Sequence, residues 1–321
     1  RAISSMDDIH DFLDDTHRDP AIAAAVTDLV VDVTTMEAAP LHLLHQLLSI
    51  VPNLVDFILL LPPDVPADFL AGFSYHALTL FKTNIPHRCL LSFMENHPTL
   101  TTLCLDSCER ADPACPLRTQ DLSAIVTLEC PLGCLHKNPC RNLVRLTAGQ
   151  RSSTCGIPAA FKAFPAAASL VYLTVEFFPD DYDVLHGIVV ATPMLRKLKL
   201  LEQHHVTRQR SHARRAWNDF AGWSRCLSKL PHLEELALRT AAAFVPVPAS
   251  SAHERTVLMR WVTGEKGRGR RCKSNHPTLH HIRVWYRARD LNNGVITYWS
   301  RYSGDWSNSF IVRDPAPGTL F

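Results

Sequence analysis

A short apolar pattern that recurs ten times is the feature that most constrains how this chain can fold. Each copy contains an apolar residue, two variable residues, an apolar residue, one variable residue, and an apolar or small residue. Successive copies begin 28, 24, 22, 25, 18, 27, 25, 38 and 46 positions apart. The copies are Val26–Val31, Leu54–Leu59, Leu78–Thr83, Leu100–Leu105, Ile125–Cys130, Leu143–Ala148, Leu170–Val175, Leu195–Leu200, Leu233–Leu238 and Leu279–Val284. Such recurrence indicates a chain built from repeated structural units.

Most of these spacings fall near the period of about 20–29 residues that is typical of a leucine-rich repeat. Amphipathic stretches, with apolar residues at three- and four-residue steps, precede many of the motifs and are followed by proline. This pattern predicts helices that end before a turn into the next strand. The stretches are Leu41–Ile50, Arg88–Asn96, Tyr182–Ala191, Phe220–Leu230 and His253–Val262. We therefore expect an α/β leucine-rich-repeat solenoid, a horseshoe with a parallel concave sheet and outer helices, over residues 1–285.

The regular spacing fails in two places, and the pattern changes near the C-terminus. Extra sequence at about 202–219 and 240–276 predicts insertions on one rim of the solenoid. The segment Val295–Trp306 is rich in aromatic and β-branched residues and contains a Ser-Gly-Asp turn signal. We expect residues 286–321 to form a β-hairpin cap over the last repeat.

Charge and cysteine content restrict the class of partner and the compartment. The 321 residues are 46% hydrophobic and 20% charged, with a formal net charge of +2. Such a small net charge predicts neither nucleic-acid nor membrane binding. The ten cysteines are scattered, several at apolar repeat positions, which favours thiols in a reducing compartment over a disulfide framework. We expect an intracellular protein, cytoplasmic or nuclear.

The most apolar stretch, Leu41–Leu61, is not expected to cross a membrane. It contains histidines, a proline and Asp56, whereas a spanning helix needs about 20 predominantly apolar residues. We interpret it as a helix, a turn and a buried strand. No basic segment followed by an apolar run and a small-residue cleavage site is present at the start of the chain.

Motifs for catalysis are absent from the sequence. There is no Gly-x-Ser-x-Gly, no phosphate-binding loop motif, no His-Glu-x-x-His and no dinucleotide fingerprint. Cys130, Cys134 and Cys140, with His136 between them, invite a zinc interpretation. The second closely spaced pair that is usual in structural zinc sites is missing. We therefore expect no enzyme activity, no metal site and no cofactor.

The best candidate site is the concave face of the predicted sheet. Side chains alternate along a strand, so the third and fifth residues of each motif, and the residue after the sixth, should face the open side. In the first half these include Asp28, Asp32, Asp56, Lys82, Asp106 and Glu129. In the second half they include Arg145, Tyr172, Glu176, Lys197, Lys199, Glu235, Arg239, Arg283 and Trp285. The face should change from acidic to basic along the chain and bind a protein partner.

The repeats, with three segments in particular, resemble the F-box/leucine-rich-repeat-like proteins of mushroom-forming fungi. The resembling segments are residues 20–31, 47–54 and 84–103, together with the closing Val295–Trp299. Members of that group often carry an F-box that docks on a cullin-type ubiquitin ligase, while the repeats hold the substrate. The resemblance thus implies a substrate-recognition role and a cullin-ligase adaptor bound through an upstream segment. No F-box is present in this chain: residues 1–50 show none, and Leu61–Leu70 resembles one only superficially.

A different class of function is left open by two basic clusters in the predicted insertions. They could bind phosphate or nucleic acid, with an affinity that falls steeply with salt. The first contains Arg208, Arg210, Arg214 and Arg215, and the second contains Arg268, Arg270, Arg271 and Lys273.

Overall fold

The computed structural model of this chain consists of two compact units. Unit 1 comprises Arg1–Leu143 with Phe164–Ala166, and unit 2 comprises Val144–Ala163 with Ala167–Phe321. The repeat pattern in the sequence does not predict this division. The structure describes residues 1–36, 41–62, 65–106, 108, 115–135, 140–149, 156–203, 215–240, 251–263, 276–287, 294–303 and 305–314.

The described strands of unit 1 are all parallel, and each pairs with its neighbours in sequence. Asp28 lies opposite Asp56, which lies opposite Leu80, so the predicted motifs are in register. The strands are β1 (Ala2–Ile3), β2 (Asp28–Asp32), β3 (Asp56–Leu60), β4 (Leu80–Thr83), β5 (Thr102–Leu105) and β6 (Thr127–Pro131). Strand β1 was not predicted.

Short helices connect these strands. Helix α1 begins with a capping box, in which the Ser5 hydroxyl accepts from the Asp8 N–H and the Asp8 carboxylate accepts from the Ser5 N–H. The helices of unit 1 are α1 (Met6–Arg18), α2 (Pro20–Ala24), α3 (Leu41–Ile50), η1 (His87–Leu90), α4 (Leu91–Glu95), η2 (Pro116–Thr119) and η3 (Leu132–Leu135). The 3-10 helix η4 (Pro165–Ser169) begins in residues assigned to unit 1 and ends in residues assigned to unit 2.

Unit 2 repeats the same arrangement and ends in an antiparallel hairpin. Its parallel strands are β7 (Arg145–Gly149), β8 (Tyr172–Phe177), β9 (Lys197–Glu202), β10 (Glu235–Thr240) and β11 (His281–Arg287). Strands β12 (Gly294–Tyr302) and β13 (Asp305–Asp314) follow in antiparallel order. Ser303 has a positive φ of 51° at the tight turn between them. The hairpin lies where the sequence predicts it.

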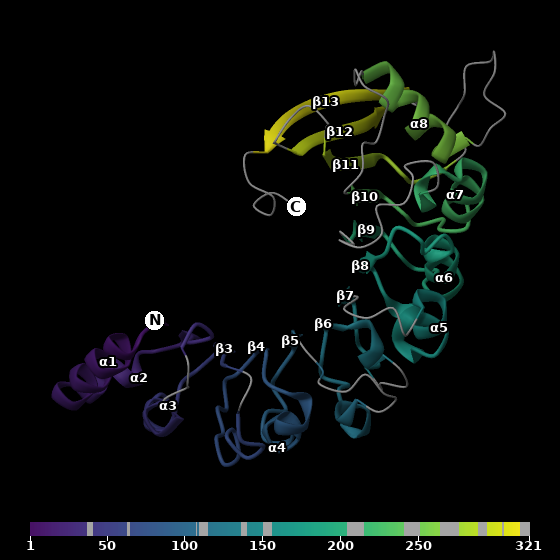
Figure 1. Cartoon of the computed structure of the whole chain (residues 1–321). Helices are drawn as coiled ribbons and strands as arrows, with labels where there is room; N and C mark the ends of the chain where they lie inside the picture. The colour runs from purple at the N-terminus through teal and green to yellow at the C-terminus, as the bar shows by residue number, and fades with distance from the viewer. Residues whose placement is uncertain are drawn as a thin grey trace. The chain divides into compact units, whose positions relative to one another are not determined.

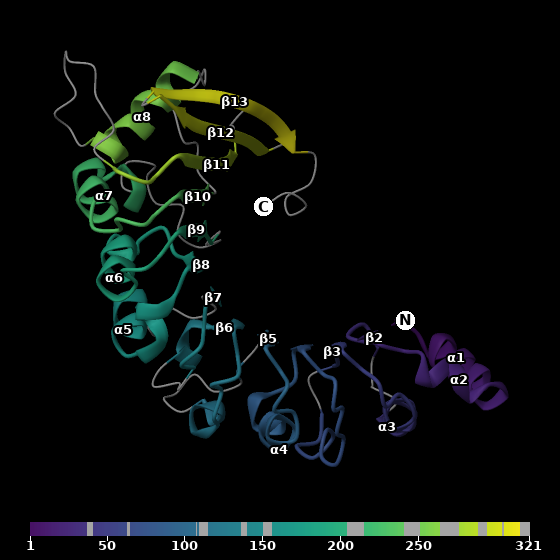
Figure 2. The same ribbon diagram turned by 180° about the vertical axis from the view of Figure 1, so that it is seen from behind.

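Helices cover one side of the unit 2 sheet, as Figures 1 and 2 show for α5 to α8. The helices are α5 (Ile157–Lys162), α6 (Val184–Ala191), η5 (Ala216–Asn218), α7 (Phe220–Leu227) and α8 (Ser251–Thr263). Helices α5 and α6 pack closely at Gly187, where an added Cβ would lie 2.7 Å from the Cα of Pro158. This contact leaves room only for glycine.

The ten predicted strands are confirmed, because apolar residues alternate as a half-buried strand requires. In the second motif, Leu54, Phe57 and Leu59 are all 0% exposed, while Asp56 and Ile58 between them are partly exposed. The predicted helix Leu41–Ile50 has the same bounds in the structure. The predicted helix Arg88–Asn96 forms as the 3-10 helix η1 followed by α4.

The tetrapeptide His-Pro-Thr-Leu occurs before β5 and again before β11, and in both units its histidine bonds to the backbone through both ring nitrogens, with the donor and acceptor nitrogens exchanged. The Nε2 atom of His97 accepts from the Tyr75 N–H at 2.9 Å, and its Nδ1 donates to the Phe93 carbonyl at 2.5 Å. The equivalent His276 donates from Nε2 to the Leu227 carbonyl at 3.0 Å and accepts at Nδ1 from the N–H of Leu279 at 3.0 Å. Both rings are buried and bonded as neutral imidazoles.

These two histidines should make folding stability depend on pH. Burial lowers the pKa of His97 and of His276 below the ordinary value for histidine, with smaller contributions from His76 and Arg301 respectively. Below about pH 6.5 these two histidines therefore bind protons more readily in the unfolded chain than in the folded chain. We expect the free energy of unfolding to be highest above this pH and to fall as the pH drops below it.

Urea unfolding between about pH 8 and pH 5 tests this expectation. The double variant H97Q/H276Q should be less stable at every pH, because hydrogen bonds are lost, but should show a flatter dependence on pH. The matched control is H10Q, at an exposed position of α1, which should keep the original slope. An unchanged slope in the double variant would contradict the assignment.

Candidate functional site

One side of the unit 2 sheet is not covered by α5 to α8 and carries the variable residues of the repeats. The strand register places Arg145, Tyr172, Lys197, Glu235 and His281 in one row across β7 to β11. The residues two positions further on form a second row, and those four positions further on form a third. We call this surface the basic face, and its charged and aromatic members are Arg145, Tyr172, Glu176, Lys197, Lys199, Glu235, Arg239, Arg283 and Trp285.

Cations lie beside aromatic rings in the first two rows of the basic face. The Arg145 guanidinium lies 4.8 Å from the ring centroid of Tyr172, and the Lys197 Nζ lies 5.9 Å from the same centroid. The guanidinium of Arg283 lies 5.1 Å from the ring of Tyr298 in β12. These distances fall within the range of cation–π attraction. The rings therefore hold the long basic side chains in place across the sheet.

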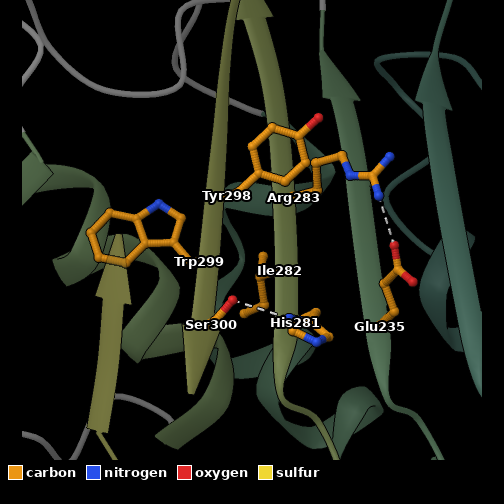
Figure 3. Close-up of a pocket in the computed structure, with 7 residues that line it drawn as sticks. All are labelled: Glu235, His281, Ile282, Arg283, Tyr298, Trp299 and Ser300. Atoms are coloured by element: carbon orange, nitrogen blue, oxygen red, sulfur yellow. Dashed lines mark hydrogen bonds and ion pairs between the residues drawn. The ribbon is translucent and has the colours of Figure 1, made fainter. Parts of the chain in front are cut away.

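Glu235 ties two of these cations together. Its carboxylate lies 3.1 Å from the Lys197 Nζ and 3.0 Å from the Arg283 Nη2. Figure 3 shows the Arg283 guanidinium directed at Glu235, with Tyr298 beside it. A hollow of about 470 Å³ opens here. It is lined by Glu235, His281, Ile282, Arg283, Tyr298, Trp299 and Ser300.

Positive charge predominates on the basic face even with Glu235 included. Arg145, Lys197, Lys199, Arg239 and Arg283 carry five positive charges. Glu176 and Glu235 carry two negative charges, which leaves three positive in excess. Burial lowers the pKa of Lys199, and the positive charges of Arg283 and Arg239 lower it further. The face therefore has a positive potential of its own, which would favour an acidic ligand.

The side of the unit 1 sheet that no described helix covers, which we call the acidic face, has the opposite charge. Five acidic residues and one lysine occupy it, an excess of four negative charges. Asp106 follows directly after β5 and donates its N–H to the Thr83 carbonyl at 3.0 Å, which continues the ladder by one residue. The charged residues of the acidic face are Asp28, Asp32, Asp56, Lys82, Asp106 and Glu129.

Trp285 differs from expectation in its accessibility. The register places it on the basic face, opposite Arg239. It is only 8% exposed, and the Arg239 guanidinium lies 5.1 Å from its ring. The alternation of side chains along a strand does not reveal such a cover from the neighbouring strand. A partner would meet Arg239 before it met Trp285.

A second group of side chains converges in unit 1 and was not recognised in the sequence. The ligand atoms of His87, Cys108, Cys115 and Cys134 all lie within 4.8 Å of one another. A hydrogen bond from the Cys134 thiol lowers the pKa of Cys115, and His87 lowers the pKa of Cys115 further. The same hydrogen bond, together with burial, raises the pKa of Cys134. The spacing considered at the sequence level links Cys134 to Cys130 and Cys140, which belong to no such group among the described residues.

Most of the predicted basic insertions lie outside the described residues. These are Arg208, Arg210 and Arg214 of the first cluster and all four members of the second. Arg215 is described, and its guanidinium forms an ion pair with Glu202, whose side chain is 0% exposed. Arg215 is therefore a partner of a buried carboxylate rather than part of an exposed basic run.

Comparison with known proteins identifies no family for this chain. No protein-family model matches it, and no curated protein is found that matches its sequence. In the part of the chain that the structure describes, no helix has the length and apolar character needed to span a bilayer.

Proposed function

We propose that this chain is a leucine-rich-repeat protein that binds another protein through the uncovered faces of its sheets and performs no catalysis. The parallel strands pair in register, and a buried apolar residue precedes each strand from β3 to β11. Both observations support the proposal that the chain is built from leucine-rich repeats. The uncovered positions differ from strand to strand while the buried positions stay apolar, which is typical of a recognition surface on a repeat scaffold.

The observation that carries the proposal is the basic face of unit 2. Its cations are held by aromatic rings and by Glu235, so a partner would meet a surface that is ordered before binding. Arginine and tyrosine are the residue types that contribute most at protein interfaces. The excess positive charge favours an acidic protein segment as the partner of this face.

The resemblance to fungal F-box/leucine-rich-repeat-like proteins extends the proposal. In such proteins the repeats hold the substrate of a ubiquitin ligase, which raises the effective concentration of the substrate near the ligase. Recovery of a cullin and its adaptor with the protein from its native cells would support this extension. Recovery of other proteins without them would support a binding scaffold that acts outside a ubiquitin ligase.

Charge reversal on the basic face tests the proposal. The variant K199E places a carboxylate near Arg239 and Arg283, whose positive charges already act on this position, so the fold should tolerate it. Partners captured by the unsubstituted protein should bind at least about tenfold more weakly, since like charges facing each other at an interface cost several kcal/mol. Affinity purification followed by quantitative mass spectrometry, and titration of the recovered partner, would measure the loss.

The matched control is K229E, which reverses a lysine at an exposed position after α7, away from the basic face. It changes the net charge of the protein equally and should leave binding unchanged. Equal binding by K199E and the unsubstituted protein would show that the basic face is not the contact surface.

A further inference from the structure

The converging residues of unit 1 form a ligand set of three sulfurs and one imidazole. The Nδ1 atom of His87 lies 3.2 Å from the Cys115 Sγ and 3.7 Å from the Cys134 Sγ. His87, Cys115 and Cys134 are 1%, 8% and 5% exposed, and Cys108 is partly exposed. The group therefore lies almost entirely inside the unit.

Three consecutive strand–helix repeats supply three of these residues from nearly equivalent positions, and the fourth, Cys115, directly precedes η2. Strands β4, β5 and β6 end at Thr83, Leu105 and Pro131. His87 follows the first end by four residues, and Cys108 and Cys134 follow the other two by three residues each. Because neighbouring parallel strands lie about 4.8 Å apart, equivalent positions beyond their ends come together. Figure 1 shows these three strands side by side.

The burial of His87 calls for a partner that the described protein atoms do not supply. Among the described residues its Nδ1 faces only sulfur atoms, which are weak hydrogen-bond partners. Its Nε2 is buried and makes no hydrogen bond to any described residue. A polar ring in such surroundings is costly unless another group stabilises it.

We propose that His87, Cys108, Cys115 and Cys134 bind one structural zinc ion. Zinc takes four ligands in a tetrahedron, with Zn–S near 2.3 Å and Zn–N near 2.0–2.1 Å, which separates the ligand atoms by about 3.5–3.8 Å. The His87 Nδ1 atom lies 3.2 and 3.7 Å from two of the sulfur atoms, and all four ligand atoms lie within 4.8 Å of one another, so a small inward movement of the side chains would complete the tetrahedron. The protein supplies all four ligands and leaves no position for a substrate, so the ion has a structural role rather than a catalytic one.

The same ligand set argues against other metals. Calcium and magnesium require oxygen ligands, and none of these four side chains offers one. Iron–sulfur clusters are generally held by four cysteine thiolates, or by two cysteines and two histidines in Rieske centres. Three sulfurs and one imidazole nitrogen around a single point match a tetrahedral zinc site.

Such an ion would join three successive repeats at the ends of their strands. A bound metal contributes to folding because the unfolded chain does not hold its ligands together. This inference goes beyond the proposed function and does not rest on it, since a zinc-bound repeat unit can bind any partner or none.

Metal content and local structure of the unsubstituted full chain test the proposal first. The protein should be produced with zinc, kept reduced, freed of loosely held metal and analysed by elemental mass spectrometry. We expect one zinc per chain. X-ray absorption at the zinc edge should show three sulfur neighbours near 2.3 Å and one nitrogen near 2.0–2.1 Å. A protein without zinc, or zinc bound mainly by nitrogen and oxygen, would overturn the proposal.

Substitution at the cluster gives a second test. C134S should lose the zinc, whereas C226S, at a half-buried position of α7 in unit 2, should retain it. Retention of zinc by C134S would place the metal elsewhere and overturn the proposal. A disulfide between Cys115 and Cys134 in the freshly isolated unsubstituted protein, detected by alkylation and mass spectrometry, would also overturn it.

Discussion

Replacement of Arg215 by methionine is expected to destabilise unit 2 by about 3–5 kcal/mol. The guanidinium of Arg215 pairs with one oxygen of Glu202, and the Thr240 hydroxyl donates to the other. The Glu202 side chain is 0% exposed and that of Arg215 is 13% exposed. Methionine fills much of the same space but leaves the buried carboxylate without its cationic partner. An uncompensated buried charge is the reason for the large effect.

Denaturant unfolding followed by tryptophan fluorescence would measure this loss. All six tryptophans lie at positions 217–306, so the signal reports on unit 2. The matched control is R196M, which breaks the exposed pair with Glu234 and should change stability far less. The double variant E202Q/R215M should recover much of the loss, because no charge remains buried. Equal effects of R215M and R196M would contradict the argument.

Trp261→Ala is expected to destabilise unit 2 by a similar amount, about 3–5 kcal/mol. Trp261 is 0% exposed, its ring centroid lies 4.7 Å from that of Trp223 in α7, and its Nε1 donates to the Trp217 carbonyl at 2.9 Å. The side chain thus fixes α8 against both α7 and η5. Alanine would leave a cavity in this core and would remove the hydrogen bond to Trp217.

Urea unfolding followed by circular dichroism would measure the effect without relying on the deleted tryptophan. Y302A removes a large aromatic side chain that is 66% exposed, and it should have little effect. W261F should fall between the two, because it keeps part of the ring volume but loses the hydrogen bond. A cost for W261A no larger than that for Y302A would mean that α8 does not depend on this contact.

The strands could be predicted from the sequence because their pattern is local. The apolar residues of each motif indicate which side chains are buried, as Leu54 and Phe57 illustrate. Because side chains alternate between the two faces of a strand, the buried residues also determine which residues lie on the other face and how neighbouring strands align. Strand β1 could not be predicted, since two residues carry no period. The division near Leu143 also has no local signal, because the motif Leu143–Ala148 is as regular as its neighbours.

The candidate sites could be predicted only where their positions follow from this local pattern. The positions of Lys197 and Arg283 on one face follow from counting along their motifs, and the register bears this out. The cover of Trp285 by Arg239 and the pairing of Arg215 with Glu202 depend on side-chain conformation, which the pattern does not contain. The cluster of His87, Cys108, Cys115 and Cys134 is spread over residues 87–134, and no two of its members are as close in sequence as the ligands of a typical zinc motif. Alignment of the motifs would have shown His87, Cys108 and Cys134 at nearly equivalent positions beyond consecutive strands.

Pairing between consecutive strands also affects how the chain could fold during its synthesis. From β8 to β13, each strand pairs with the one made just before it, so the sheet of unit 2 can grow in the order in which the ribosome releases the chain. At about 5–20 residues per second, a repeat of about 25 residues takes roughly one to five seconds to emerge. Throughout that interval the newest strand presents an open hydrogen-bonding edge, to which another nascent chain could add. Chaperones that shield such an edge would be most useful while the long segments before β10 and β11 are being made.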